Sequence, residues 1–186
     1  YKAADVQIEP DASAATYLWA AEVLSGGDID LGVNQFTQPD AKAKDMIAAF
    51  PHMPQIIDGS QMQDAVPTLA VLAAFNAHPV RFVGIANLRV KECDRIRALS
   101  LGLNAIRQGL AGEEGDDLVV NADPSLAGQS RPAEIDAFAD HRIAMSFALA
   151  GLKIRGITIR DPDCVAKTFP DYWTVFGSLG VRTELG

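Results

Sequence analysis

The sequence predicts an α/β domain with threefold internal pseudosymmetry, because three segments repeat the same order of features. In each segment an Asp leads into an apolar stretch of helical length, and a turn and a short strand-like run follow. A polar loop and a second, more amphipathic helix come after each strand. Helices alternating with short strands are typical of α/β domains. The 48% hydrophobic and 22% charged residues fit one globular domain over residues 1–186 and exclude a disordered chain.

The first repeat begins at Asp11 and is short. It predicts, in order, a helix over residues 14–24, a strand over 29–33, a second helix over 41–50 and a strand at 55–57. Pro51 to Met62 leaves room for only that last strand before the second repeat starts. We therefore expect a shortened first unit.

The second and third repeats begin at Asp64 and Asp140. They predict helices over 66–75, 95–106, 143–152 and 172–179, with strands over 80–85, 118–120, near 134–135 and over 157–159. The first helix of each repeat is rich in Ala and apolar almost all round, so it should be buried. The second helices are more amphipathic and should lie further out.

The charge balance argues against broad electrostatic binding to nucleic acid or to an anionic membrane. Sixteen Lys and Arg residues stand against twenty-four Asp and Glu residues, a formal net charge of −8. No apolar run approaches the roughly 20 residues of a membrane-spanning helix and no signal-peptide pattern is present, so we expect a cytoplasmic protein. Cys93 and Cys164 lack metal-ligand spacing. Because the chain starts at Tyr1, we expect a piece of a longer protein.

The densest group of charges lies at the junction between a predicted strand and a predicted helix. Its members are, in order, Arg89, Lys91, Glu92, Asp94 and Arg95. Free backbone N–H groups and the helix dipole favour anions at such a junction. One interpretation is a solvated loop with local salt bridges. The other is a ligand site, since several helix starts in one domain can converge on a single anion.

Other residues also have two interpretations. Asp64 is either a helix N-cap, which the sequence alone favours, or a general base. His141 is either a buried histidine at a helix start or a ligand contact, and Arg142 beside it is hard to explain on an apolar helix. Lys167 is either an ordinary surface lysine or part of the same site. Cys93 has cationic neighbours but no local base, so we do not expect a thiol nucleophile.

Three motifs resemble the signatures of the 5-enolpyruvylshikimate-3-phosphate synthase family. They are RVKECDRI at residues 89–96, DHRIAM at 140–145 and KTFPDY at 167–172. The opening IEPDAS at 8–13 also resembles the start of that family's C-terminal domain, so the resemblance spans almost the whole chain. It implies one domain of three pseudo-symmetric βαβαββ units, an inside-out α/β barrel. It also implies an active site in a cleft shared with a similar N-terminal domain that this chain lacks.

The resemblance implies an activity and a set of site residues. The enzyme would transfer the enolpyruvyl group of phosphoenolpyruvate to the 5-hydroxyl of shikimate 3-phosphate and release phosphate, without a metal or organic cofactor. Asp64 would accept the hydroxyl proton, and Glu92 would protonate the methylene carbon. The resemblance places Asn87 and Lys91 on shikimate 3-phosphate, Arg95, Arg142 and Lys167 on phosphoenolpyruvate, and His141 as a hydrogen-bonding neighbour. Without the other domain, we expect weak binding and little or no turnover.

These roles agree with elementary chemistry. Guanidinium groups match a phosphate and a carboxylate with bidentate geometry. Addition of a hydroxyl across a double bond needs one carboxyl group to give a proton and another to take one. Glu92 would therefore need a raised pKa, against the effect of the cations around it.

The sequence departs from the family pattern in two places. Ala14 replaces a second Ser after Ser13, and the segment from Phe50 to Gln61 is short, as though a hairpin of the first unit were missing. Two alternatives stay open. One is the related transferase acting on UDP-N-acetylglucosamine, which lacks this combination of Lys91-Glu92 with Asp140-His141-Arg142. The other is a non-catalytic domain that binds anions or serves as a scaffold.

Overall fold

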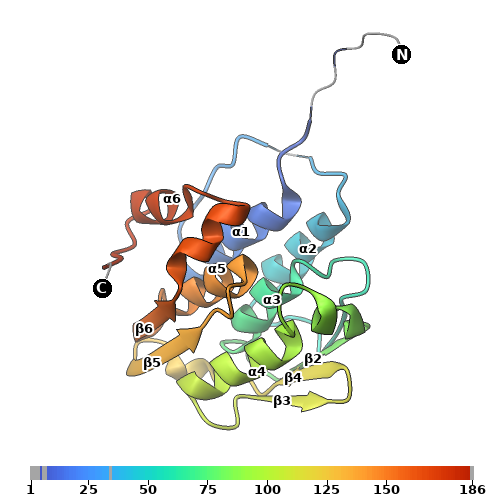
Figure 1. The fold of residues 1–186 in the computed structure, drawn as a ribbon, viewed down its shortest axis with the longest axis vertical. Coiled ribbons are helices and arrows are strands. Elements are labelled where there is room, and N and C mark those ends of the chain that lie inside the picture. The colour runs from blue at the N-terminus through green and yellow to red at the C-terminus, as the bar shows by residue number, and fades with distance from the viewer. Residues whose placement is uncertain (1–4, 6–7, 34, 185–186) are drawn as a thin grey trace.

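Three helices form the centre of the computed structural model, which describes residues 5, 8–33 and 35–184 (Figure 1). They are α1 (Ala12–Ser25), α3 (Val66–Ala73) and α5 (His141–Ala150), and they pack against one another. Every residue of α3 is buried, as is every residue of α5 except Arg142. This confirms that the first helix of each repeat is buried, as the apolar composition predicted.

Buried hydroxyl groups join the three central helices. Thr16 on α1 lies 3.1 Å from Thr68 on α3, and Thr68 lies 3.5 Å from Ser146 on α5, measured between hydroxyl oxygens. All three side chains are fully buried, so each needs an internal partner. The contacts therefore favour one relative placement of the helices.

The remaining helices lie around this centre (Figure 1). They are η1 (Pro39–Lys42), α2 (Ala43–Ala48), η2 (Ala86–Val90), α4 (Arg95–Ile106), η3 (Pro124–Leu126), η4 (Pro162–Lys167) and α6 (Tyr172–Ser178). The helix α4 illustrates the amphipathic pattern, because Ile96, Leu99 and Leu103 are buried while Arg97 is exposed. None of the helices among the described residues is long and apolar enough to cross a membrane.

Two sheets lie at the edge of the helical centre (Figure 1). Their strands are β1 (Ile56–Asp58), β2 (Val80–Val83), β3 (Ala111–Glu114), β4 (Asp117–Val120), β5 (Ser130–Asp136) and β6 (Arg155–Arg160). The larger sheet has the order β1-β2-β4-β3, with β1 and β2 parallel and both β2-β4 and β4-β3 antiparallel. The smaller sheet pairs β5 and β6 in parallel. Each parallel pair is joined through a central helix, as parallel connections require.

The observed elements confirm the α/β class. The run β1-α3-β2-α4-β3-β4 contains a complete βαβαββ unit, and β5-α5-β6-α6 follows the first four elements of another. The strand β3 was not predicted, because its residues Ala-Gly-Glu-Glu have weak strand propensity. It forms because it pairs with β4 across the turn at Gly115.

The strand predicted over residues 29–33 is wrong. The described part of the first repeat contains α1, η1 and α2, and its one strand is β1, which confirms the strand predicted at 55–57 but pairs with β2 of the second repeat. The first unit is therefore shortened further than expected. Instead, the Asp30 carboxylate accepts the N–H of Gly32 at 2.8 Å, and Gly32 has a positive φ of 65°. Ile29 and Leu31 pack against the core. A strand needs a neighbouring strand for its backbone groups, and none lies beside these residues in the described chain.

Candidate active site

Charged residues gather where several helices begin. The Asp11 carboxylate caps α1 by accepting the N–H of Ser13 at 2.8 Å, and Asp140 caps α5 by accepting the N–H of Arg142 at 2.9 Å. Both contacts are of the N-cap type that Asp favours. The helix starts therefore bring polar side chains to one end of an otherwise apolar centre.

Asp64 differs from these two residues, and its interpretation as an N-cap is wrong. The N-cap position of α3 is Ala65, which makes no side-chain cap bond, and Pro67 lies in the first turn. Proline fits there because its missing N–H would have had no helical partner. The Asp64 carboxylate is thus available to cations from other elements.

Arg95, the first residue of α4, lies at the centre of these charges. Its side chain is 1% exposed, and its guanidinium donates to three carboxylates. Nε bonds to Asp140 at 2.7 Å, Nη1 to Asp64 at 2.9 Å and Nη2 to Glu92 at 2.5 Å. Burial by itself lowers the pKa of Arg95, but the bond to Asp140 and the charges of the other carboxylates raise it overall. Arg95 is therefore a charged group held almost without solvent.

Asp64 joins two further cations to this centre. Its carboxylate lies 3.1 Å from Nη2 of Arg142 at the start of α5 and 3.8 Å from Nζ of Lys91. These contacts bring together residues that the sequence placed on separate helix starts. The structure thus brings Asp64, Lys91, Arg95 and Arg142 together at one point, and the binding of an anion there stays a prediction.

Glu92 links this cluster to the C-terminal part of the chain. Its second oxygen accepts from Nζ of Lys167, at the end of η4, at 2.7 Å. Burial acts to raise the pKa of Glu92, but the hydrogen bond from Lys167 and the charge of Arg95 outweigh it and lower the pKa to about 2. The structure therefore does not show the raised pKa that an acid would need. Glu92 is a carboxylate here.

Two of the predicted site residues lie outside the ion-pair network. Asn87 is exposed on η2, and its side chain makes no hydrogen bond to the part of the chain that the structure describes. The His141 side chain is 2% exposed, and neither ring nitrogen has a hydrogen-bond partner among the described residues. Burial and the neighbouring Arg142 charge lower the pKa of His141, so the ring is neutral.

Cys93 shows no sign of an activated thiol. Its sulfur lies 3.6 Å from Oδ2 of Asp140, and burial together with that carboxylate raises the pKa of the thiol to about 12. The expectation of no thiol nucleophile agrees with this environment.

Two further residues lie at the cluster, although the sequence indicated no site role for either. Asp140 is fully buried and binds Arg95. Its signal was its position as the Asp that leads into a repeat helix. The buried hydroxyl of Tyr17 on α1 has no hydrogen-bond partner in the described chain. Burial raises its pKa to about 12, although the nearby Arg142 charge opposes the shift. Tyr17 gave no signal, because an aromatic residue is ordinary on an apolar helix.

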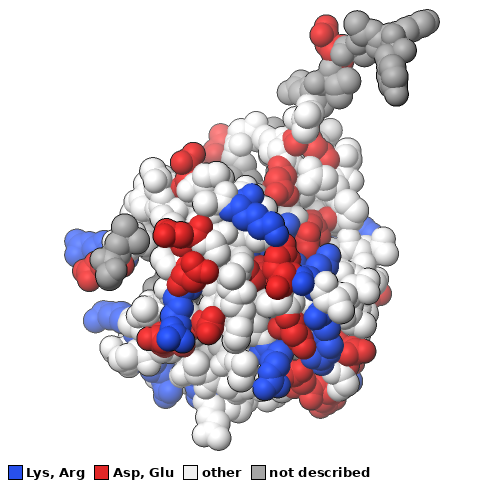
Figure 2. All heavy atoms as spheres, viewed as in Figure 1, with Lys and Arg blue, Asp and Glu red and all other residues white. Residues whose placement is uncertain are grey.

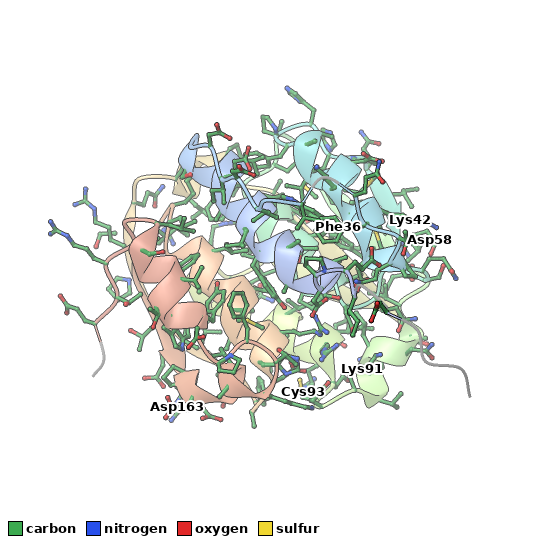
Figure 3. The ribbon with its side chains drawn as sticks, turned by 90° about the horizontal axis from the view of Figure 1, so that it is seen from above. Phe36, Lys42, Asp58, Lys91, Cys93 and Asp163 are labelled. Carbon is green, nitrogen blue, oxygen red and sulfur yellow. The ribbon has the colours of Figure 1, made fainter. Side chains whose placement is uncertain are left out.

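The arrangement is suited to exchange of anions. Lys91, Arg95, Arg142 and Lys167 face three carboxylates of the chain itself, Asp64, Glu92 and Asp140. Figure 2 shows acidic and basic side chains interleaved over one face of the molecule, without a large region of a single sign. Figure 3 shows Cys93, from the segment between η2 and α4, close to the orange-red C-terminal part of the chain. An incoming anion with several oxygens could replace Glu92 on both Lys167 and Arg95.

Replacing Asp140 by Asn tests whether Arg95 depends on this buried partner. Asn retains the capping function, but it leaves the buried guanidinium less neutralised, so D140N should lower the free energy of unfolding by about 3 kcal/mol. Urea denaturation measures the change. D11N is the matched control, because Asp11 caps α1 but touches no buried cation, and it should cost less than about 1 kcal/mol. Equal losses in the two variants would contradict the role of Asp140.

Replacing Glu92 by Gln tests the lowered pKa. Because the folded pKa lies below the ordinary 4.5, ionised Glu92 stabilises the fold fully above about pH 4.5, and this contribution disappears as the pH falls toward 2. The free energy of unfolding of the wild type should exceed that of E92Q by up to about 3 kcal/mol at pH 5. This difference should become smaller toward pH 3. Unfolding curves at several pH values measure it. E134Q is the control, because the Glu134–Arg160 pair is 61% exposed on both sides. A constant gap for E92Q would rule out the shift.

Comparisons with known proteins agree with the motifs. Residues 1–176 match the family EPSP synthase (3-phosphoshikimate 1-carboxyvinyltransferase). A 3-phosphoshikimate 1-carboxyvinyltransferase of Rhizobium etli (strain CIAT 652) is 79% identical over 186 residues, covering 99% of this chain and 44% of that protein. Its counterpart in Pseudomonas savastanoi pv. phaseolicola is 71% identical over 186 residues, again covering 99% of this chain and 44% of that protein. The chain thus spans less than half the length of these curated relatives.

A solved structure supports the fold. The EPSP synthase of Acinetobacter baumannii superposes with a TM-score of 0.66 at 21% identity, covering 93% of this chain and 46% of that one. At this identity the likeness speaks for the fold alone, while the family match and the curated relatives rest on sequence. Together these findings show that the chain belongs to the EPSP synthase family.

Proposed function

We propose that this chain is the C-terminal domain of a two-domain enolpyruvyl transferase. With an N-terminal domain, it transfers the enolpyruvyl group of phosphoenolpyruvate to the 5-hydroxyl of shikimate 3-phosphate and releases phosphate. The observation that carries the proposal is the convergence of Asp64 and Glu92 on Arg95, with Arg142 and Lys167 beside them. The cytoplasmic location expected from the sequence is part of the same proposal.

The cations supply the binding of phosphoenolpyruvate. This substrate carries a phosphate and a carboxylate, and Arg95 and Arg142 offer planar donor groups to match them. Lys167 is 57% exposed, so it can turn from Glu92 to a ligand. Lys91 and Asn87 lie on the side of η2 and the following loop, where they would contact shikimate 3-phosphate.

The two carboxylates supply the proton transfers. As the 5-hydroxyl oxygen bonds to C2 of phosphoenolpyruvate, Asp64 takes the hydroxyl proton and Glu92 gives a proton to C3. Because the product is again an enolpyruvyl group, a proton must leave C3 as the C2–O bond to phosphate breaks. In this proposal, Glu92 takes that proton back.

Substrate binding also accounts for the protonation state that Glu92 needs. Lys167 and Arg95 lower the pKa of Glu92 and keep it ionised in the structure. If the anionic substrate takes over these two cations, the burial that already acts to raise the pKa of Glu92 is no longer outweighed. The acid would therefore form only when phosphoenolpyruvate is bound.

Phosphate release from phosphoenolpyruvate and shikimate 3-phosphate tests the proposal. The chain alone should release little, and a mixture with the N-terminal part of the Rhizobium etli relative should be active. D64N should lower the turnover of the mixture at least about 100-fold. D58N is the control, because Asp58 lies exposed on β1 and contacts no residue of the cluster.

The other outcomes separate the alternatives. Activity with UDP-N-acetylglucosamine in place of shikimate 3-phosphate would show the related transferase. A folded, associated mixture that is inert with both acceptors would show a domain that only binds anions or acts as a scaffold. Either result would overturn the proposal.

A further inference from the structure

Arg89 is the one cation of the charged segment 87–95 to which the proposed function gives no role. It lies on η2, two residues before Lys91, with its side chain 26% exposed. Its guanidinium does not contact the ion-pair network around Arg95. It points instead to the turn between β3 and β4 and to the start of α4.

The guanidinium of Arg89 bonds to four acceptors. Nη1 donates to Asp94 at 2.8 Å and to Glu113 at 2.9 Å. Nε donates to Asp116 at 2.8 Å, and Nη2 donates to the carbonyl of Gly115 at 2.6 Å. Four of the five N–H groups that an arginine offers are therefore used. A surface arginine with one partner would be held far less firmly.

The acceptor Asp94 connects Arg89 to the site. While one oxygen of Asp94 accepts from Arg89, the other accepts the N–H of Arg97 at 3.1 Å and so caps α4. The first residue of that helix is Arg95. Arg89 thus holds the carboxylate that fixes where α4 begins, and with it the backbone of Arg95.

The short segment between η2 and α4 is held by side-chain contacts and not by regular backbone structure. Residues 91–94 have neither helical nor strand structure. Val90 is 82% exposed, so it does not anchor the segment in the core. Leu88 before it is buried, and the ion pairs of the segment itself face the cluster around Arg95, with Lys91 near Asp64 and Glu92 bound to Arg95 and Lys167. The polar bonds of Arg89 are therefore the described contacts that tie this segment, through Asp94, to the β3–β4 turn.

We propose that Arg89 is a positioning residue, which braces the segment 91–95 against the β3–β4 turn and so sets where Lys91, Glu92 and Arg95 present their charges. The proposal rests on the proposed function for what these charges bind. Without Arg89, the carboxylates of Asp94, Glu113 and Asp116 would also lose their shared cation, and of the described ion pairs only the 4.0 Å contact between Glu113 and Arg97 would remain. Both effects would release the segment from the turn.

Arg81 provides a matched control. It lies on β2 and binds the same turn, through Glu114 at 2.6 Å and Asp117 at 2.7 Å. Neither partner belongs to the segment before α4. R81Q thus removes an arginine from the same acidic turn without touching Asp94.

Hydrogen exchange in the full chain, without any ligand, tests the brace. R89Q should speed the exchange of the amides of residues 91–97 at least about tenfold, whereas R81Q should leave them unchanged and affect only the strands and turn around residues 113–117. D94N should reproduce part of the R89Q effect, and the double variant R89Q/D94N should be no worse than R89Q, since both changes break the same bond. Unchanged exchange at 91–97 in R89Q, or an equal effect in R81Q, would overturn the proposal.

Phosphoenolpyruvate binding separates positioning from general stability. Calorimetric titration is done on the chain together with the N-terminal part of the relative. The affinity for phosphoenolpyruvate should be about tenfold lower in R89Q but unchanged in R81Q. Each variant is measured at the same interval below its own melting temperature. R89K, which keeps the charge but not the fork of donors, should fall between R89Q and the wild type. It also serves if R89Q does not fold. Equal affinity for phosphoenolpyruvate in R89Q and R81Q would refute the positioning role. If the wild type bound no phosphoenolpyruvate, the proposed function would be refuted, and hydrogen exchange alone would test whether Arg89 restrains the segment.

Discussion

The buried guanidinium of Arg95 is the group on which the rest of the site depends. A charge that is 1% exposed needs opposite charges and hydrogen bonds around it, because solvent cannot stabilise it. Asp140 supplies the fully buried partner, and Asp64 and Glu92 supply the other two. Because these carboxylates come from the starts of α5 and α3 and from the segment before α4, satisfying one guanidinium brings three parts of the chain together.

The apolar centre and the polar site depend on each other. The helices α1, α3 and α5 pack through small and apolar side chains, with Thr16, Thr68 and Ser146 in contact inside. Close packing of buried side chains leaves little freedom for one helix start to shift against another. The carboxylates at those starts are therefore held near the cations before any ligand arrives, and such preorganisation is what charge stabilisation in a reaction requires.

Much of this arrangement could be predicted from the sequence, where the signal is local. The helix α4 has the predicted bounds. Asp94 is a strong N-cap, and the apolar residues after it are spaced so that they lie on one buried face of the helix. The DHR and KTFPDY motifs located Arg142 and Lys167 correctly in the same neighbourhood. What failed depends on contacts between distant residues. The run 29–33 has strand-like residues but no strand beside it, and β3 has poor strand residues but pairs with β4.

The charge states were the hardest part to foresee. Sequence alone could not tell that Asp64 would bind arginines and leave the cap of α3 unused, nor that Lys167 would hold Glu92 in its ionised form. The role of Arg89 was equally hidden, because its partners Glu113 and Asp116 lie on a turn far along the chain. These charge states and ion pairs depend on which groups become neighbours in the folded chain, and a local stretch of sequence does not contain that information.

Exchange of the Arg95 Nε–H proton with solvent, followed by NMR in the unliganded chain, tests the central claim most directly. The account predicts a distinct and slowly exchanging signal, because this proton is buried and bonded to Asp140. Arg97, two residues further along α4 and 65% exposed, serves as the internal reference and should exchange rapidly. If the two protons exchanged at the same rate, Arg95 would be open to solvent, and the site would not be assembled before its ligand binds.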